Sequence, residues 1–188
     1  MQCSVLLRPP LPPRDLYLIT AACALAVRSA VLPLLRTAPQ LKWPNDVLLE
    51  EWKVCGILSE TELTRGEAPV AVVGFGLNVH AAPDQGIVPN ATSLSEHAIH
   101  PLTRLDVLCR VLREYDHLLS LLYGGGADGI WQQWRCELQT LGTQVQIRAP
   151  GGTAATGLAL DVSRDGGLVL ETSAGVTRTV YSGEVAEP

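Results

Sequence analysis

The chain has 188 residues, 47% of them hydrophobic, and a formal net charge of −5. This length and composition are sufficient for a well-buried core, and the acidic balance argues against a general nucleic-acid binder, which would carry a basic face. The five cysteines are widely spread without a C-x-x-C pair, and the four histidines lack metal-ligand spacing. This pattern favours buried thiols in a reducing compartment over a disulfide framework or a zinc site, so we expect a cytoplasmic protein without a metal-ligand cluster.

The N-terminal segment predicts a strand followed by a long helix. Cys3 to Arg8 favours a strand, which the prolines in residues 9–13 end. Asp15 is expected to cap a helix from Leu16 to Leu35, and the high content of Ala and Leu predicts that this helix is buried. Its apolar run from Leu16 to Val27 is too short to cross a bilayer and follows no basic segment, so we expect neither a membrane span nor a signal peptide.

Two hairpins follow in the sequence pattern. The first pairs Leu41–Trp43 with Val47–Glu50 around a Pro-Asn-Asp turn. The second pairs the β-rich runs Lys53–Thr61 and Val70–Gly74 across a polar loop at residues 62–68.

An amphipathic helix is predicted at Arg104–Tyr123, after a loop at residues 80–95. Leucine and tyrosine side chains recur there at spacings of three and four, with charged residues between them. Three glycines at 124–126 end this helix, and a short helix that carries Trp131 and Trp134 follows. The predicted apolar face comprises Leu105, Leu108, Leu112, Tyr115, Leu119 and Leu122.

From Leu141 onward the pattern changes to short alternating strands, as in a small antiparallel barrel. Glycine-containing turns at residues 165–167 and 174–175 separate the strands. We therefore predict two domains, residues 1–140 and 141–188, with a boundary near Thr140. The candidate strands of the second domain are Gln144–Arg148, Thr156–Val162, Leu168–Thr172 and Val176–Tyr181.

Of the fourteen basic residues other than histidine, only Lys42 and Lys53 are lysines. A compact ammonium group suits contact with a single phosphate or carboxylate oxygen, which a guanidinium fork does less well. Lys42 begins the segment KWPND, in which Trp43 would stack on a base, Asn45 would read polar edges and Asp46 would orient a metal ion or a hydroxyl. The alternative is an ordinary Pro-Asn-Asp turn with solvated charges.

Lys53 begins the segment KVCGILSE, which is expected to be a strand. Regular alternation places Lys53 on one face with Cys55, Ile57 and Ser59, and places Gly56 on the other face. A glycine at this position would let a ligand or a neighbouring backbone approach closely. The alternative is a lysine on an edge strand that prevents strand pairing between molecules.

Gly74, Gly76 and Asn78 lie where a predicted strand runs into a glycine turn. A single G-x-G is weak as a motif, so the segment is open to two interpretations. It is either a tight turn alone or a ligand site to which Asn78 presents its amide.

In this order, the segments resemble the biotin protein ligases, which attach biotin to acceptor carrier domains. The resemblance covers nearly the whole chain, including the amphipathic helix and the W-x-x-W segment, and it favours the ligand-binding interpretation of both lysine segments. It implies an α+β fold, in which a mixed or antiparallel sheet with helices, like that of class II aminoacyl-tRNA synthetases, precedes a C-terminal β-barrel of the Src-homology-3-like type. The matching pieces are KWPND (42–46), KVCGILSE (53–60), VVGFGLNV (72–79), ATSL (91–94) and YSGEV (181–185).

The resemblance implies a two-step reaction that uses biotin, ATP and Mg²⁺. Biotin and Mg-ATP give biotinyl-5′-AMP, and biotin then passes to a lysine of a carrier protein, such as the biotin carboxyl carrier of acetyl-CoA carboxylase. Lys53 would be the catalytic residue, in contact with biotin and the developing phosphoryl charge, and the C-terminal barrel would help to hold nucleotide or carrier. The implied biotin- and adenylate-binding residues are Lys42, Trp43, Asn45, Asp46, Lys53, Gly56, Gly74, Gly76 and Asn78.

The chain departs from the family before Cys3. Family members carry there a Thr/Ser-rich biotin-binding segment and a loop rich in glycine and arginine, and some carry a DNA-binding domain. Loss of strands from the sheet would expose an apolar edge, through which two chains would be able to dimerise. We therefore expect either that the true start codon lies upstream or that the chain is a marginally stable, nearly inactive fragment.

Three functions are compatible with these observations. The first is a biotin protein ligase, and the second is a non-catalytic module that holds nucleotide or carrier protein without activating biotin. The third is the related lipoate-transferring branch. The KWPND segment and the C-terminal barrel favour biotin over lipoate.

Overall fold

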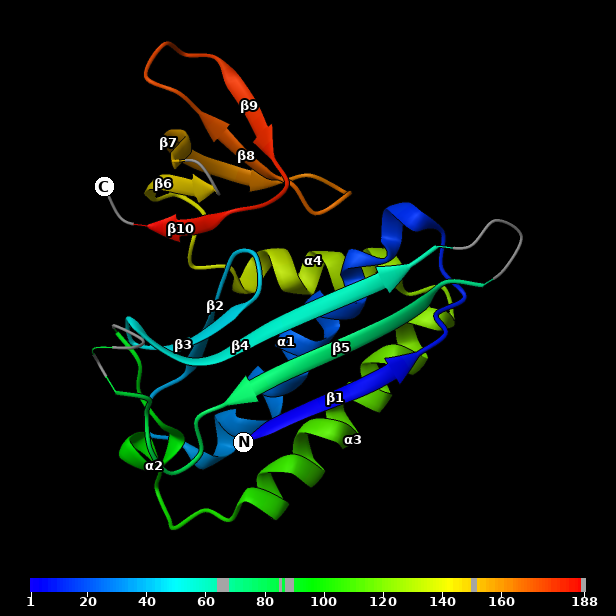
Figure 1. The fold of residues 1–188 in the computed structure, drawn as a ribbon, viewed down its shortest axis with the longest axis vertical. Coiled ribbons are helices and arrows are strands. Elements are labelled where there is room, and N and C mark those ends of the chain that lie inside the picture. The colour runs from blue at the N-terminus through cyan, green and yellow to red at the C-terminus, as the bar shows by residue number, and fades with distance from the viewer. Residues whose placement is uncertain (64–67, 85, 87–89, 150–151, 187–188) are drawn as a thin grey trace.

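The computed structural model describes residues 1–63, 68–84, 86, 90–149 and 152–186. It contains two antiparallel five-stranded sheets, and helices pack against the first of them (Figure 1). The α+β class predicted from the sequence is therefore confirmed. Parts of the loops predicted at residues 62–68 and 80–95 lie outside the described residues.

The first sheet has the strand order β1-β5-β4-β3-β2, and all its neighbours are antiparallel. The N-terminal strand and both hairpins predicted from the sequence are confirmed. One face of the sheet lies against helices, whereas the other is open and exposes Leu6, Leu58 and Val72 (Figure 1). The strands are β1 (Gln2–Leu7), β2 (Pro39–Lys42), β3 (Asp46–Leu49), β4 (Trp52–Glu62) and β5 (Val70–Leu77).

Helix α1 (Tyr17–Val31) is the centre of the core. Residues 21–27 are each at most 2% exposed, and their alanines let α3 (Arg104–Tyr123), α4 (Ala127–Glu137) and the sheet pack closely around the helix. A helix that is apolar on all sides is expected to be buried. The longer helical segment Pro13–Leu34 has the length and composition of a membrane span, but 67% of its most apolar stretch is buried inside this fold.

The predicted cap of α1 by Asp15 is wrong. Asp15 ends a 3₁₀ turn (Pro13–Asp15) that continues through Leu16, whose backbone is already helical, so no extended capping residue precedes α1. The Asp15 carboxylate instead lies 3.5 Å from the guanidinium of Arg164, in the C-terminal part of the chain.

Helix α3 begins and ends where the sequence predicts, with Thr103 Oγ1 accepting a hydrogen bond from Asp106 N at its start. Its buried face differs from the predicted one, because Leu105 and Leu112 are 68% and 37% exposed. Leucines lie on several sides of this helix, so spacings of three and four fit more than one stripe. The observed stripe comprises Val107, Val111, Tyr115, Leu118, Leu119 and Leu122.

The second sheet has the strand order β10-β6-β7-β8-β9 and lies above α4 and the β2–β3 hairpin (Figure 1). Strand β10 (Glu184–Ala186) pairs with β6 and was not predicted from the sequence, because three residues are too few for an alternating pattern. The presence of two separate sheets supports the predicted division into domains, which stays a prediction. The strands are β6 (Gln144–Ala149), β7 (Gly152–Val162), β8 (Leu168–Glu171), β9 (Thr177–Val180) and β10 (Glu184–Ala186).

All five cysteines are free, as expected, but only some are buried. Burial raises the pKa of the Cys23 thiol to about 12 and that of Cys55 well above its usual value. Cys109 and Cys136 are exposed, which corrects the expectation of buried thiols. Within the described part of the chain, no group of three or more His, Cys, Asp or Glu side chains could hold a metal ion.

A bidentate ion pair between Arg135 of α4 and Asp161 of β7 joins the second sheet to the helices. Arg135 Nη2 lies 3.0 Å from Asp161 Oδ2, and Arg135 Nε donates to Oδ1. These hydrogen bonds, together with one from Val162 N, hold the pKa of the Asp161 carboxyl below its usual value. Both side chains are 40% exposed, so water and salt weaken the pair.

The ion pair predicts a specific loss of stability in acid. A carboxylate with a depressed pKa stabilises the fold above its ordinary pKa of 3.8, and this stabilisation is lost as the pH falls through the lower pKa of the folded state. We expect the free energy of unfolding to fall more steeply below about pH 4 in the unmodified protein than in Asp161→Asn. Urea unfolding of both proteins between pH 5 and pH 2 measures the difference, and parallel curves would contradict this role.

Candidate active site

Lys53 lies at a β-bulge near the start of β4, on the open face of the first sheet. The β3–β4 ladder pairs Val47 with Cys55 and then shifts so that Leu48 pairs with Lys53, which leaves Val54 as an extra residue. A bulge of this kind interrupts the regular alternation of side chains. The Lys53 side chain consequently extends over Gly56, where an added Cβ would lie 3.0 Å from Lys53 Cε. The predicted placement of Lys53 on the face of Cys55 is therefore wrong.

Residues 90–92 hold the backbone of Lys53 in place. Lys53 N donates to Asn90 O at 2.7 Å, and Thr92 N donates to Lys53 O at 2.9 Å, which forms a short parallel bridge beside β4. Asn78 supports this segment, because its Nδ2 donates to Thr92 O at 3.0 Å. The bulge is thus fixed from both sides of the strand.

Asp46 lies opposite Gly56 in the ladder and forms an ion pair with Lys53. Lys53 Nζ is 2.6 Å from Asp46 Oδ1, and the two side chains are 40% and 20% exposed. The preceding residue, Asn45, is bound to β4 by its backbone and its side chain, because Ile57 N donates to Asn45 O and Asn45 Nδ2 donates to Ile57 O. The β2–β3 turn therefore holds Asp46 at a defined position beside the ammonium group.

A cavity of about 390 Å³ on the open face, which we call the glycine trough, lies next to this ion pair. Gly56 pairs with Gly76 across β4 and β5, and Gly74 lies two pairs further along, opposite Leu58. The three glycines add no side chains to the floor of the trough, so a ligand is able to lie directly on their backbone. Beyond the glycines, β1 contributes Gln2 and Ser4 to the lining.

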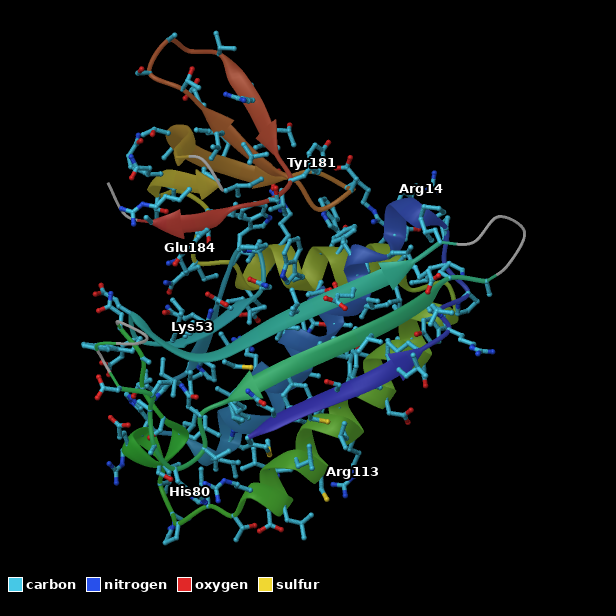
Figure 2. The ribbon with its side chains drawn as sticks, viewed as in Figure 1. Arg14, Lys53, His80, Arg113, Tyr181 and Glu184 are labelled. Atoms are coloured by element: carbon cyan, nitrogen blue, oxygen red, sulfur yellow. The ribbon has the colours of Figure 1, made fainter. Side chains whose placement is uncertain are left out.

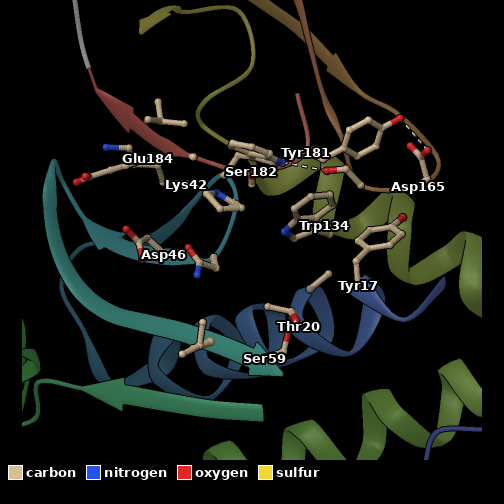
Figure 3. Close-up of a pocket in the computed structure, with 18 of the residues that line it drawn as sticks. Tyr17, Thr20, Lys42, Asp46, Ser59, Trp134, Asp165, Tyr181, Ser182 and Glu184 are labelled. Atoms are coloured by element: carbon tan, nitrogen blue, oxygen red, sulfur yellow. Dashed lines mark hydrogen bonds between the residues drawn. The ribbon is translucent and has the colours of Figure 1, made fainter. Parts of the chain in front are cut away.

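A second cavity of about 590 Å³, the inter-sheet cleft, lies between the first sheet, α1, α4 and the C-terminal sheet (Figure 3). Both volumes are within the roughly 300–1,000 Å³ typical of small-molecule sites. The cleft and the trough share Asn45, Asp46, Lys53 and Leu58 in their linings. The Lys53–Asp46 ion pair therefore lies at the junction of the two cavities.

Lys42 and Trp43 both line the inter-sheet cleft, but they differ in how far their side chains are available to a ligand. No carboxylate lies within ion-pair distance of the Lys42 ammonium among the residues that the structure describes, so this charge is available to a ligand. Trp43 is only 1% exposed, and its Nε1 donates to Gly166 O at 3.0 Å. The indole is therefore engaged with the C-terminal sheet as well as with the cleft.

Several cleft residues escaped the sequence analysis. Tyr17 contacts Trp134 with ring centroids 5.9 Å apart, and burial raises the pKa of its phenol to about 12. Tyr17, Thr20 and Ala21 follow a helical spacing that would have placed them on one face of α1. Tyr181 and Glu184 lie in the segment YSGEV, which carried the family resemblance but no assigned role.

The structure brings together all the predicted site residues except Asn78. Lys42 and Trp43 line the cleft, the three glycines line the trough, and Asn45, Asp46 and Lys53 line both. Asn78 lines neither cavity and instead bonds to the segment that holds Lys53. The roles of these residues toward a ligand stay predictions.

The comparisons with known proteins agree on one family. Residues 140–186 match the family model described as the biotin protein ligase C terminal domain. Over 170 residues the chain is 34% identical to the biotin–[acetyl-CoA-carboxylase] ligase of Mycobacterium tuberculosis, with 89% of this chain and 61% of that ligase covered. It is 29% identical over 185 residues to the bifunctional ligase/repressor BirA of Bacillus subtilis, with 97% and 56% covered. The chain thus spans 56–61% of the length of these curated relatives.

A solved structure has the same fold. The biotin protein ligase from Aquifex aeolicus, in complex with biotin and ATP, superimposes with a TM-score of 0.78 and is 28% identical in sequence. The match covers 98% of this chain and 76% of the Aquifex chain.

The contact over Gly56 predicts a difference between two glycine substitutions. A Cβ at Gly56 would lie 3.1 Å from Lys53 Nζ, whereas a Cβ at Gly76 would meet nothing within 4 Å. We expect Gly56→Ala to displace the ammonium from Asp46 and Gly76→Ala to leave it in place. With lysine labelled by ¹³C at Cε, the two lysines give two NMR signals. The Lys53 signal should move in Gly56→Ala as it does in Asp46→Asn, and equal behaviour of the two glycine variants would contradict this.

Proposed function

The chain belongs to the biotin protein ligase family, and we propose that it activates biotin with ATP as biotinyl-5′-AMP and transfers biotin to a lysine of a carrier protein. The observation that carries this proposal is the position of the Lys53 ammonium at the junction of the glycine trough and the inter-sheet cleft. An ammonium group at the point where two substrates meet stabilises the negative charge that develops as a phosphoryl group is attacked.

The two cavities fit the two substrates. The glycine trough is the smaller one, and the bare backbone of its three glycines suits the flat bicyclic ring of biotin, with the carboxylate tail directed toward Lys53. The inter-sheet cleft is larger and contains Lys42, whose ammonium has no ion-pair partner in the described part of the chain and suits a phosphate group. Biotin and ATP therefore approach Lys53 from opposite sides, with Asn45 and Asp46 between them.

The position of Lys53 suits the charge change of the first chemical step. A carboxylate oxygen of biotin attacks the α-phosphorus of ATP, and the bond to pyrophosphate breaks, so negative charge develops at the phosphoryl oxygens. An ammonium group that Asp46 and the bulge already hold in place stabilises this charge without reorganisation. In the second step, the carrier amine attacks the acyl carbon and AMP leaves.

Magnesium would arrive with the nucleotide. Mg²⁺ is usually held by one or two carboxylates together with substrate phosphates, and it neutralises phosphate charge. Asp46 fits this role, because its carboxylate lines both cavities beside Lys53.

Several finer features belong to the same proposal. We infer that the first sheet is of the class II aminoacyl-tRNA synthetase type, that the second sheet is a barrel of the Src-homology-3-like type, and that the protein is cytoplasmic. The acceptor is the biotin carboxyl carrier of acetyl-CoA carboxylase, in agreement with the name of the Mycobacterium tuberculosis relative. A homodimer is compatible with the free edge of β1, and this chain has no role in nucleic-acid binding.

The proposal predicts distinct effects for the two lysines. We expect Lys53→Met to lower kcat for adenylate formation by about 10²–10³-fold, as for other lost charge-stabilising donors. Lys42→Met should mainly raise KM for ATP, because its charge meets the nucleotide before the reaction. Biotin-dependent exchange of pyrophosphate into ATP measures both, with the exposed Arg113→Met as a charge-matched control. Unchanged exchange in Lys53→Met would remove Lys53 from this role.

Titration calorimetry separates a ligase from a non-catalytic module. A ligase is expected to bind biotinyl-5′-AMP, with weaker binding in Lys53→Met. Binding of the carrier domain without binding of the adenylate would favour the module.

A further inference from the structure

The turn between β7 and β8, residues 163–167, joins the C-terminal sheet to α1, α4 and the β2–β3 turn. Three aromatic side chains from three different elements donate hydrogen bonds to its carbonyl groups. Tyr17 of α1 donates to Arg164 O at 3.1 Å, Trp43 donates to Gly166 O at 3.0 Å, and Trp131 of α4 donates to Ser163 O at 3.2 Å. A buried aromatic residue with a polar tip is suited to such a task, because the ring packs while the tip bonds.

Arg164 adds charge to this contact. Its Nη2 lies 2.7 Å from Asp128, and its Nη1 lies 3.5 Å from Asp15, whose side chain is only 12% exposed. Its guanidinium also lies 5.8 Å from the centre of the Trp131 ring. A planar guanidinium is able to make ion pairs at its edge and stack on an aromatic ring at the same time. Arg164 thus joins the turn to both α4 and the 3₁₀ turn before α1.

The β7–β8 turn packs closely against its neighbours, with no space for a side chain at Gly166 or Gly167. Gly166 has φ +87°, and an added Cβ would lie 2.6 Å from Cδ2 of Tyr17. A Cβ at Gly167 would lie 2.8 Å from Cε1 of Tyr181. A side chain at either position would push the turn away from α1 or from the last segment of the C-terminal sheet.

The same turn determines the position of the upper wall of the cleft. Asp165 and Gly166 line the cleft directly, and Asp165 Oδ2 accepts a hydrogen bond of 3.0 Å from the Tyr181 hydroxyl (Figure 3). Tyr181 is followed by residues 182–185, which line the cleft opposite Lys42. Among the residues that the structure describes, in contrast, none from the C-terminal sheet lines the glycine trough.

We propose that Arg164 is a positioning residue that seats the β7–β8 turn and thereby sets the opening of the inter-sheet cleft above Lys42 and Lys53. It acts on the phosphate-binding half of the site through the turn and Tyr181, and it leaves the glycine trough unaffected. This assignment to the nucleotide half rests on the proposed function, whereas the seating of the turn does not.

The test compares Arg164→Met with Arg113→Met, a change of the same chemistry on the outer face of α3 (Figure 2). Without any ligand, hydrogen exchange of backbone amides in residues 163–167 and 181–185 should become about tenfold faster in Arg164→Met, because one charge-assisted contact is lost. Amides of β4 and β5 should keep their protection in both variants. Unchanged exchange in the turn, or faster exchange throughout the chain, would overturn the proposal.

Ligand binding by the same two variants provides the second part of the test. By calorimetry, the Kd for Mg-ATP should rise about tenfold in Arg164→Met, while the Kd for biotin stays the same. Equal weakening of both ligands would show a general loss of structure and overturn the positioning role. If the unmodified protein binds no Mg-ATP, the proposed function fails, and the exchange measurement alone decides whether the turn is seated by Arg164.

Trp131→Phe serves as a second variant in case Arg164→Met does not fold. It keeps an aromatic ring beside Arg164 and removes the indole donor to Ser163 O. It should speed exchange in the same two segments to a smaller degree. Protection equal to that of the unmodified protein in this variant would contradict the seating of the turn by α4.

Discussion

The ammonium of Lys53, placed over Gly56 and paired with Asp46, is the contact on which the rest of the site depends. A lysine side chain reaches this position only because β4 carries a bulge at Val54, which turns Lys53 onto the open face of the sheet. It stays there because residues 90–92 hold its backbone and because Gly56, over which its side chain lies, has no Cβ. Local backbone geometry, rather than burial, thus places the charge, which remains 40% exposed and accessible to a substrate.

The two cavities of the site are built by different parts of the fold. The trough is built on the first sheet alone, where three glycines bare the backbone. The cleft needs the C-terminal sheet, whose β7–β8 turn is seated on aromatic donors from α1, the β2–β3 turn and α4. Trp43 links the first sheet to the C-terminal sheet, because it belongs to the same turn as Asp46 and its indole donates a hydrogen bond to Gly166 O. Trp43 thus ties the cleft side of the β2–β3 turn to the C-terminal sheet, whereas the glycine trough rests on the first sheet.

Much of this fold follows from local patterns in the sequence. The hairpins around Asn45 and after Lys53 were predictable from turn residues and β-rich runs, and α3 was predictable to the residue. The errors arose where distant contacts decide the outcome. The bulge at Val54 depends on the register with β3, the Asp15 carboxylate turns toward Arg164, and the buried stripe of α3 is selected by its packing on α1. Composition drew attention to both lysines, whereas only helical spacing could have pointed to the cleft residues Tyr17 and Thr20.

The most direct test of the account asks whether one ligand contacts both lysines at once. Because the chain has only two lysines, ¹³C labelling at Cε gives one NMR signal for each. Titration with biotinol-5′-AMP, a stable analogue of the adenylate, should move the Lys53 and Lys42 signals together and saturate both at one equivalent. If neither signal moves at saturating ligand, or if Lys42 alone responds, Lys53 does not lie at the junction of the two substrates and the account is wrong.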